Sequence, residues 1–394
     1  MPTEATFLLA GLFVVAAATG WAFAKFSNFR RNDSPSDPIS SDYLRGLNFV
    51  LNRQTDEALE LFVRMAKVDD DTLETHFALG HLFRRRGEVD RAIRVHQNLL
   101  ARPNLSEDQR HQALFSLAQD FSSAGLFDRA EKLFSELDTS PGLGEEALKN
   151  LVDIYESQSD WIKAIETHRE LEVLSGEKST EIAHYYCELA ERARLDGDLD
   201  LARRYLKSSV RSATGAFRGT LIRAAIAQEE EDYAQALRLY EQILEADYRL
   251  MVEVLPDLII CYQTAGREVE LENYLQELIS KDASLKHAIA YAAILGEISG
   301  LNVIETCIEE FVLKDKIFAS FIDEEYMASL SSEERQAAIQ RIANGLRSLA
   351  ASGARYRCTT CGYNSQKLLW HCPSCKSWES IRPLQRFQFE NPSA

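Results

Sequence analysis

The stretch Leu82–Leu100, LFRRRGEVDRAIRVHQNLL, holds one copy of a pattern that recurs along the chain. Its alanine, Ala92, is preceded at nine positions by Phe83 and at five positions by Gly87, and is followed at four positions by His96. A further small residue, Gly80, lies twelve positions before Ala92. This arrangement predicts two short antiparallel helices that cross closely at their small residues and are joined at the glycine.

The same frame recurs between residues 41 and 244, at spacings of 34, 38, 34, 38 and 34 residues. Its reference alanines are Ala58, Ala92, Ala130, Ala164, Ala202 and Ala236. Six unrelated helix pairs would not be expected to keep such a period, whereas a repeat array requires it because each pair covers the apolar face of the next. The pattern resembles the tetratricopeptide repeat, so we expect an all-α solenoid of helix pairs.

The repeat pattern weakens after Leu244. Leu258, Cys261, Gly266 and Tyr274 fit a seventh repeat, but Glu270 then occupies the reference position. Helical periodicity continues more loosely, and residues 331–350 are predicted to form a final helix. Degenerate terminal repeats usually cap a solenoid. We therefore expect the solenoid to cover residues 41–350, with a degenerate last part.

Composition excludes some classes of protein. The 394 residues carry 44 basic and 61 acidic side chains, a net charge of -17, which argues against a surface that binds nucleic acid. Three cysteines, Cys187, Cys261 and Cys307, lie in predicted helices, and the other four cluster near the C-terminus. Isolated thiols are typical of a reducing compartment.

An uncharged stretch of 18 residues, FLLAGLFVVAAATGWAFA, covers residues 7–24. It is long enough to span a bilayer, and a cleaved signal peptide is the alternative. No Lys or Arg precedes the stretch, whereas Lys25, Arg30 and Arg31 follow it, which favours a membrane anchor with the rest of the chain in the cytoplasm. We expect an external tail at residues 1–6, a transmembrane helix at 7–26 and a cytoplasmic linker at 27–40.

The C-terminal sequence RYRCTTCGYNSQKLLWHCPSCKSW, residues 355–378, contains two Cys-x-x-Cys pairs. Such pairs can bring four sulfurs around one ion, and the predicted metal ligands are Cys358, Cys361, Cys372 and Cys375. The module is expected at residues 355–385, with a strand at 368–370. The segments CTTCGY and CPSC resemble the two knuckles of rubredoxin, but Lys376 stands where the second knuckle would have its glycine, which favours a shortened rubredoxin-like module.

Three interpretations of this module remain open: a structural or docking site that holds one iron or zinc ion, a redox or metal-sensing site, and a pair of disulfides. The chain has no phosphate-binding loop, no dinucleotide-binding motif and no His-Glu-x-x-His, so we expect no enzyme, no catalytic residue and no cofactor besides the metal ion. Candidate partner-binding residues on the inner face of the second repeat are Phe77, His81, Arg84 and Arg85, and those of the fourth are Lys149, Asp153 and Glu156. The alternative for such charges is ordinary solvated surface.

The anchor, the repeats and the terminal module together, with the phrases LFRRRGEVDRAIRVHQNLL, IAHYYCELA and RYRCTTCGY, resemble the lipopolysaccharide assembly protein B family over essentially the whole chain. The resemblance implies a single-pass protein of the bacterial inner membrane, with a periplasmic N-terminus and its bulk on the cytoplasmic side. It implies an adaptor that promotes degradation of the lipid A pathway deacetylase by the membrane-bound AAA protease. Other lipopolysaccharide synthesis or transport proteins are further candidate partners. A membrane-tethered rubredoxin-like electron carrier or redox sensor is the alternative function.

Overall fold

The computed structural model describes residues 41–52, 54–68, 73–212, 217–314, 324–350 and 353–384. These residues belong to two compact units, whose boundaries along the chain are Met1–Ile154 and Tyr155–Ala394. Within the described ranges, no helix has the length and apolar character needed to cross a membrane. The expected tail, transmembrane helix and linker at residues 1–40 lie outside the described residues.

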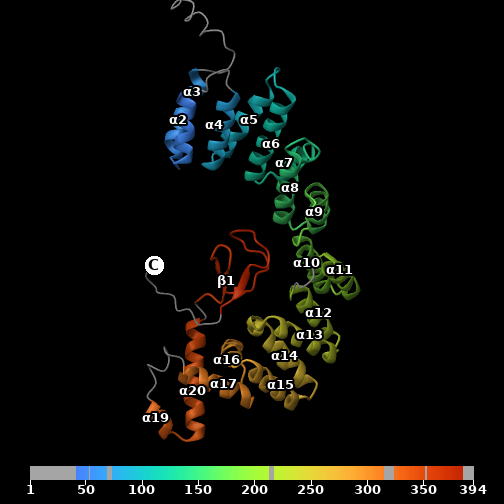
Figure 1. Cartoon of the computed structure of the whole chain (residues 1–394), viewed down its shortest axis with the longest axis vertical. Helices are drawn as coiled ribbons and strands as arrows, with labels where there is room; N and C mark the ends of the chain where they lie inside the picture. Colours follow the sequence, from blue (N-terminus) through green and yellow to red (C-terminus); the bar gives the residue numbers. More distant parts are fainter. Residues whose placement is uncertain are drawn as a thin grey trace, which may run out of the picture. The chain divides into compact units, whose positions relative to one another are not determined.

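Both units are built from antiparallel helix pairs that follow one another in chain order (Figure 1). The helices of the first unit are α2 (Ser41–Leu51), α3 (Thr55–Val68), α4 (Leu73–Arg85), α5 (Val89–Leu100), α6 (Glu107–Ser123), α7 (Phe127–Ser135) and most of α8 (Gly144–Gln158). Those of the second unit are α9 (Trp161–Ser175), α10 (Glu181–Leu195), α11 (Leu199–Ser212), α12 (Phe217–Glu229), α13 (Tyr233–Ala246), α14 (Met251–Thr264), α15 (Glu268–Lys281), α16 (Leu285–Gly296), α17 (Asn302–Lys314), α19 (Glu324–Ser329) and α20 (Ser332–Ala350), with a 3-10 turn η1 (Tyr248–Leu250) before α14.

The small residues lie where the two helices of a pair cross, as the sequence predicts. All six reference alanines have no exposed surface. A Cβ on Gly80 of α4 would lie 2.4 Å from Nε2 of His96 on α5, and one on Gly46 of α2 would lie 2.5 Å from the ring of Phe62 on α3. In these two pairs the glycine therefore makes room for the ring four residues after the reference alanine.

The turn inside each pair has one backbone form. The N–H four residues before the reference alanine donates to the carbonyl nine residues before it, as in Glu88 to Phe83 at 2.9 Å and Asp198 to Ala193 at 2.9 Å. This is the helix C-cap in which one residue adopts a left-handed conformation. Glycine fills that position at Gly87, Gly125 and Gly197, with φ of 83°, 72° and 83°. The other described examples among these repeats are Ser159 and Glu231, with φ of 57° and 62°.

The seventh pair, α14 and α15, has its reference position at Leu271, so the sequence assignment to Glu270 was wrong by one residue. The N–H of Arg267 donates to the carbonyl of Tyr262 at 2.9 Å, and Gly266 has a φ of 65°. Counting five residues on from this glycine gives Leu271, which is fully buried. Glu270 is exposed and pairs with Arg267. The turn glycine, and not the period, fixes the register here.

The same turn recurs between α16 and α17, where Ile298 N–H donates to the carbonyl of Ala293 at 3.0 Å and Glu297 has a φ of 58°. The loosely periodic residues after 281 therefore form a further pair of the same kind. The predicted final helix is confirmed as α20, and Ser331 caps it by accepting from the N–H of Glu334. At the start of α6, Ser106 and Gln109 form a capping box, in which each side chain binds the backbone N–H of the other residue.

The C-terminal module is a three-stranded antiparallel sheet of order β2-β1-β3. Its strands are β1 (Tyr356–Cys358), β2 (Asn364–Ser365) and β3 (Ile381–Pro383). The strand predicted at residues 368–370 was wrong. Leu368 and Leu369 instead pack on the small core formed by Tyr356, Cys358, Cys372 and Ile381, while β3, beyond the second Cys pair, takes the place beside β1.

Candidate metal centre and its docking face

The four predicted ligands come together in the C-terminal module. The sulfurs of Cys358, Cys361, Cys372 and Cys375 all lie within 4.8 Å of one another. The Sγ atoms of Cys358 and Cys375 are 3.7 Å apart, as are those of Cys361 and Cys372, and all four thiols are free. A tetrahedral ion with metal–sulfur bonds of about 2.3 Å would hold its sulfurs about 3.8 Å apart. The donor set therefore fits one thiolate-bound ion.

Both Cys-x-x-Cys segments form the same knuckle. The N–H of Gly362 donates to the carbonyl of Cys358 at 3.0 Å, and the N–H of Lys376 donates to that of Cys372 at 2.9 Å. Each donor residue is left-handed, with φ of 79° for Gly362 and 61° for Lys376. The missing glycine thus leaves the second knuckle intact, although a non-glycine residue there carries backbone strain.

Hydrogen bonding and burial shift the thiol pKa values in opposite directions. The Ser380 hydroxyl, 3.3 Å from the Cys358 sulfur, and nearby backbone amides lower the pKa of Cys358 to about 5. Burial raises the pKa of Cys372 to about 11. Since a metal ligand must be a thiolate, Cys358 is prepared for binding by its surroundings, and Cys372 needs the positive charge of the ion.

The module docks on the helices of the second unit through Trp378. The indole Nε1–H of Trp378 donates to Oε1 of Glu156 on α8 at 2.8 Å. The same oxygen accepts a hydrogen bond of 2.7 Å from the hydroxyl of Tyr185 on α10. His371, next to a ligand, lies with Nε2 3.7 Å from Oε2 of Glu156. One carboxylate therefore joins two helix pairs to the metal module.

Aromatic rings surround Trp378 on both faces. His184 of α10 stacks on it with centroids 5.2 Å apart and an interplanar angle of 12°, and His371 stacks on it at 4.5 Å and 16°. The ring of Trp161 lies nearly perpendicular to that of Trp378, with the two centroids 6.0 Å apart. Burial lowers the pKa of His184 to about 4, so its imidazole is neutral at neutral pH and packs as an aromatic ring.

Further contacts extend this docking face along the first helices of successive pairs. The guanidinium of Arg218 on α12 lies over the ring of Trp370, and that of Arg382 lies over Phe217. The hydroxyl of Tyr356 donates to Glu253 of α14. The first helices of four successive pairs, α8, α10, α12 and α14, thus all contact the module. Arg382, a basic residue of the module, therefore serves this packing.

The candidate partner-binding residues of the second repeat lie on α4 in the first unit. Arg85 is exposed, while Phe77, His81 and Arg84 are half-buried. Phe77 packs near the ring of His96 at 6.2 Å, and Nε2 of His81 lies 3.4 Å from the hydroxyl of Ser116 on α6. Burial, and then Arg84, lower the pKa of His81 to about 4.

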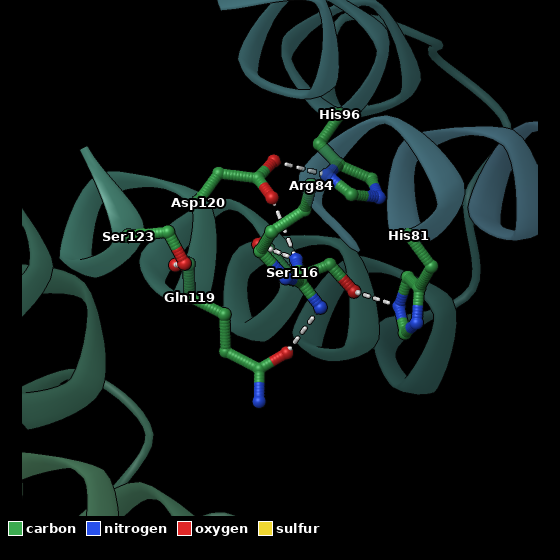
Figure 2. Close-up of polar contacts among 7 residues, drawn as sticks. All are labelled: His81, Arg84, His96, Ser116, Gln119, Asp120 and Ser123. Atoms are coloured by element: carbon green, nitrogen blue, oxygen red, sulfur yellow. Dashed lines mark hydrogen bonds and ion pairs between the residues drawn. The ribbon is translucent and has the colours of Figure 1, made fainter. Parts of the chain in front are cut away.

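Arg84 lies at the centre of a polar cluster between α4, α5 and α6 (Figure 2). It donates to Oδ1 of the fully buried Asp120 at 2.6 Å and to the side chain of Gln119 at 2.8 Å, and Nδ1 of His96 lies 2.5 Å from Oδ2 of Asp120. Asp120 is the residue that sequence analysis missed. The available signal was its position four residues after Ser116 in FSLAQD, which puts it on the same helix face as that small residue.

Glu156 was predicted from the sequence to lie on the inner face of the fourth repeat, but its hydrogen-bond partner Trp378 was not predicted. The four metal ligands are all brought together, whereas Lys149 is exposed and pairs with Glu145 on its own helix. The signal for this contact in the sequence was the presence of Trp370 and Trp378 in a module that is too small to bury them, because large aromatic side chains then pack on another surface.

Comparisons with known proteins agree with this geometry. A model described as a rubredoxin metal binding domain matches residues 356–383, and a tetratricopeptide repeat model matches residues 75–110. Lipopolysaccharide assembly protein B of Escherichia coli strain K12 is 34% identical over 383 residues, which cover 96% of this chain and 98% of that protein. The chain belongs to the lipopolysaccharide assembly protein B family.

The relative from Haemophilus influenzae, also named lipopolysaccharide assembly protein B, is 32% identical over 395 residues, with 96% of this chain and 98% of that protein covered. Among solved structures, the MamA protein is 18% identical over 42% of this chain and 87% of its own, at a TM-score of 0.33. The names of the family members describe assembly proteins, in agreement with the expectation that this protein is not an enzyme.

Proposed function

We propose that this protein is an inner-membrane adaptor that regulates lipopolysaccharide synthesis. In this proposal it promotes degradation of the lipid A pathway deacetylase by the membrane-bound AAA protease, and it gathers lipopolysaccharide synthesis proteins at the membrane. Residues 7–26 anchor it, with the repeats on the cytoplasmic side. Membership of the assembly protein B family over 96% of the chain is the observation that carries the proposal.

The distribution of free and covered surface supports an adaptor. In the second unit, the first helices α10, α12 and α14 contact the metal module. In the first unit, α4 carries the exposed Arg85 beside the half-buried Phe77 and His81. Tetratricopeptide-type repeats bind partners by such helix faces. We therefore assign client binding to the α4 face, and a structural role to the ion held by the four cysteines.

Tethering raises the effective concentration of a client near a membrane protease, since the adaptor confines it to a thin shell beside the bilayer. Deleting residues 1–29 should therefore lengthen the half-life of the deacetylase in cells, while the truncated protein keeps its metal and its folded helices. A variant whose first 26 residues are replaced by an unrelated single-span segment of the same orientation is the control, and it should restore the short half-life. Normal deacetylase turnover with the truncated protein would refute the tethering argument.

Photocrosslinking in cells tests the client-binding face. A photoreactive amino acid at Arg85 should crosslink to the deacetylase or to the protease. The same amino acid at Arg94, which is exposed on the second helix of the same pair, serves as the control and should crosslink weakly. Equal crosslinking at both positions would remove the assignment of the partner surface to α4.

The alternative function, an electron carrier or redox sensor, is favoured by one observation: Cys361 is exposed, so one ligand residue of the centre lies at the surface. Metal analysis and a visible spectrum of the full-length protein from iron-replete cells separate the two functions. A colourless zinc protein agrees with a structural ion. The carrier or sensor would be favoured by a red protein that is reduced and reoxidised reversibly, provided that loss of this redox activity also slows deacetylase turnover.

A further inference from the structure

A cavity of about 550 Å³ lies between α11, α12 and α13 in the second unit, and no residue of the metal module lines it. Leu206, Ile226 and Ala227 line it as buried apolar side chains. Val210, at 51% exposure, stands at its mouth. A volume of this size is in the range of small-molecule sites. We call it the α11–α13 pocket.

Basic side chains gather around this pocket, although the whole chain has a net charge of -17. Arg203, Lys207 and Arg211 follow one another at intervals of four residues on α11, and Arg223 approaches from α12. Like charges at this spacing on a helix repel each other. The repulsion is unfavourable unless an anion lies among them.

Three of these four cations have no acidic partner within the part of the chain that the structure describes. Arg203 pairs with Glu230, the acidic residue of the lining, and with Asp200 at 3.1 Å. Lys207, Arg211 and Arg223 make no ion pair with described residues. The lining of the pocket thus combines buried apolar side chains with positive charge that no described acidic residue neutralises.

We propose that the α11–α13 pocket binds a phosphorylated amphiphile, with its phosphate at Lys207, Arg211 and Arg223 and its apolar chain or ring along Leu206, Val210 and Ile226. Guanidinium and ammonium groups bind phosphate oxygens by charge-assisted hydrogen bonds, and the apolar wall gains by covering a chain. This site goes beyond the proposed adaptor function and does not depend on it.

The pocket fits an amphiphile better than an acidic peptide. A peptide that entered it would bring backbone N–H and C=O groups that need hydrogen-bond partners. The basic side chains could donate to peptide carbonyls, but acceptors for the N–H groups are few: Glu230 already pairs with Arg203, which leaves Gln235, and the backbone groups of the surrounding helices are used within the helices. An acyl chain or an apolar ring has no such requirement.

Calorimetric titration of the full-length protein in phosphatidylcholine nanodiscs tests the proposal, with soluble dihexanoylphosphatidic acid as the probe. The double variant Lys207→Gln/Arg211→Gln should weaken binding by about tenfold or more, because two charge-assisted contacts are lost. The control Arg192→Gln/Arg204→Gln removes the same charge from exposed residues outside the lining and should bind as the parent protein does. Unchanged affinity in the first variant would overturn the proposal.

A second variant and two further probes test the amphiphilic character. Val210→Glu places a carboxylate at the mouth of the pocket and should abolish binding while the helices stay protected from hydrogen exchange. Inorganic phosphate and dihexanoylphosphatidylcholine should each bind much more weakly than the phosphatidic acid. Equal affinity for either of them would contradict the proposal, and so would displacement of the probe by an equal concentration of an acidic peptide with a central leucine.

The source of the ligand follows from nanodiscs that also contain long-chain phosphatidic acid. Competition with the soluble probe in these discs supports a lipid headgroup of the bilayer as the ligand. Binding of the probe without such competition supports a soluble phosphorylated amphiphile. Both results agree with the same chemistry in the α11–α13 pocket.

Discussion

Two carboxylates with little exposure are satisfied in different ways. Asp120 in the first unit is held by Arg84 and His96, which stand 36 and 24 residues away on neighbouring helices. Glu156 in the second unit accepts from Trp378, which lies 222 residues further along the chain. The first cluster is completed by adjacent repeats alone. The second exists only when the metal module is folded, so it links the repeats to the four-cysteine centre.

The largest expected effect comes from removing the module's metal ligands. Cys372→Ser/Cys375→Ser should release the ion, and residues 353–384 should lose protection from hydrogen exchange because structural metal binding supplies the folding free energy of such modules. Amides of α10 should then exchange faster, whereas those of α4 and α6 should not change. Metal analysis and hydrogen-exchange mass spectrometry measure both.

Ser374→Ala, an exposed change between the same two cysteines, is the control for this variant and should keep the metal. Retention of the ion by the double variant would show that the ligand assignment is wrong. A smaller increase of exchange in α10 than in the module would agree with the attachment through Glu156. Unchanged exchange in α10 would show that the metal does not stabilise the contacts of Glu156.

Asp120→Ala should produce the next largest effect. It leaves the cationic Arg84 and the buried His96 without their carboxylate, and the loss of one partner from a buried pair costs about 3–5 kcal/mol. Hydrogen exchange should therefore rise across α4, α5 and α6, with no change in metal content. Asp128→Ala, at an exposed position on α7, should alter stability by less than about 0.5 kcal/mol. Comparable effects of the two variants would contradict the role of the cluster.

Trp378→Phe tests the attachment through Glu156 with a smaller expected effect than Asp120→Ala. It keeps an aromatic ring between His184 and His371 but removes the hydrogen bond to Glu156, at a cost of about 1–3 kcal/mol. Local exchange in the module and α10 should increase while the metal stays bound. Trp370→Phe is the matched control, since the Trp370 ring contacts Arg218 through its face. A larger effect at residue 370 than at 378 would show that Glu156 is not the main attachment point.

The smallest effect concerns acid sensitivity in the first unit. Burial lowers the pKa of His81 to about 4 from an ordinary 6.5, so between these values the unfolded chain binds a proton that the folded chain does not. The His81 contribution therefore destabilises the fold as the pH falls through this window. His81→Gln should reduce this loss in α4 and α6, measured as opening free energies by hydrogen exchange. The same pH dependence in both proteins would exclude His81 as a source.

Local features of the fold could be predicted from sequence because they depend on neighbouring residues. The buried alanines, the turn glycines and the two Cys-x-x-Cys knuckles all follow from short-range spacing. The reference position at Leu271 could be predicted only by counting five residues on from the turn glycine Gly266, and not by adding the repeat period of 34 residues to Ala236. The left-handed conformation of Lys376 could not, because its knuckle geometry overrides the preference for glycine.

The docking of the module was beyond sequence analysis for a physical reason. The residues that bind Trp378 belong to first helices whose pattern is the same in every repeat, so nothing local marks Glu156, His184 or Tyr185 as contact residues. The polar cluster around Asp120 was missed for a related reason. Its partners come from three helices, and each charge by itself is typical of a solvated surface.

The attachment of Trp378 to Glu156 has a consequence for synthesis on the ribosome. Helix pairs of a solenoid can fold as they emerge, but the surface formed by Trp161, His184 and Tyr185 has to wait for a tryptophan that is encoded 222 residues after Glu156. At elongation rates of about 5–20 residues per second, this interval is roughly 10–40 seconds. During that time the nascent chain presents an uncovered aromatic surface to chaperones. A shortage of the module's metal would prolong this exposure after synthesis ends, because the module that carries Trp378 would not fold.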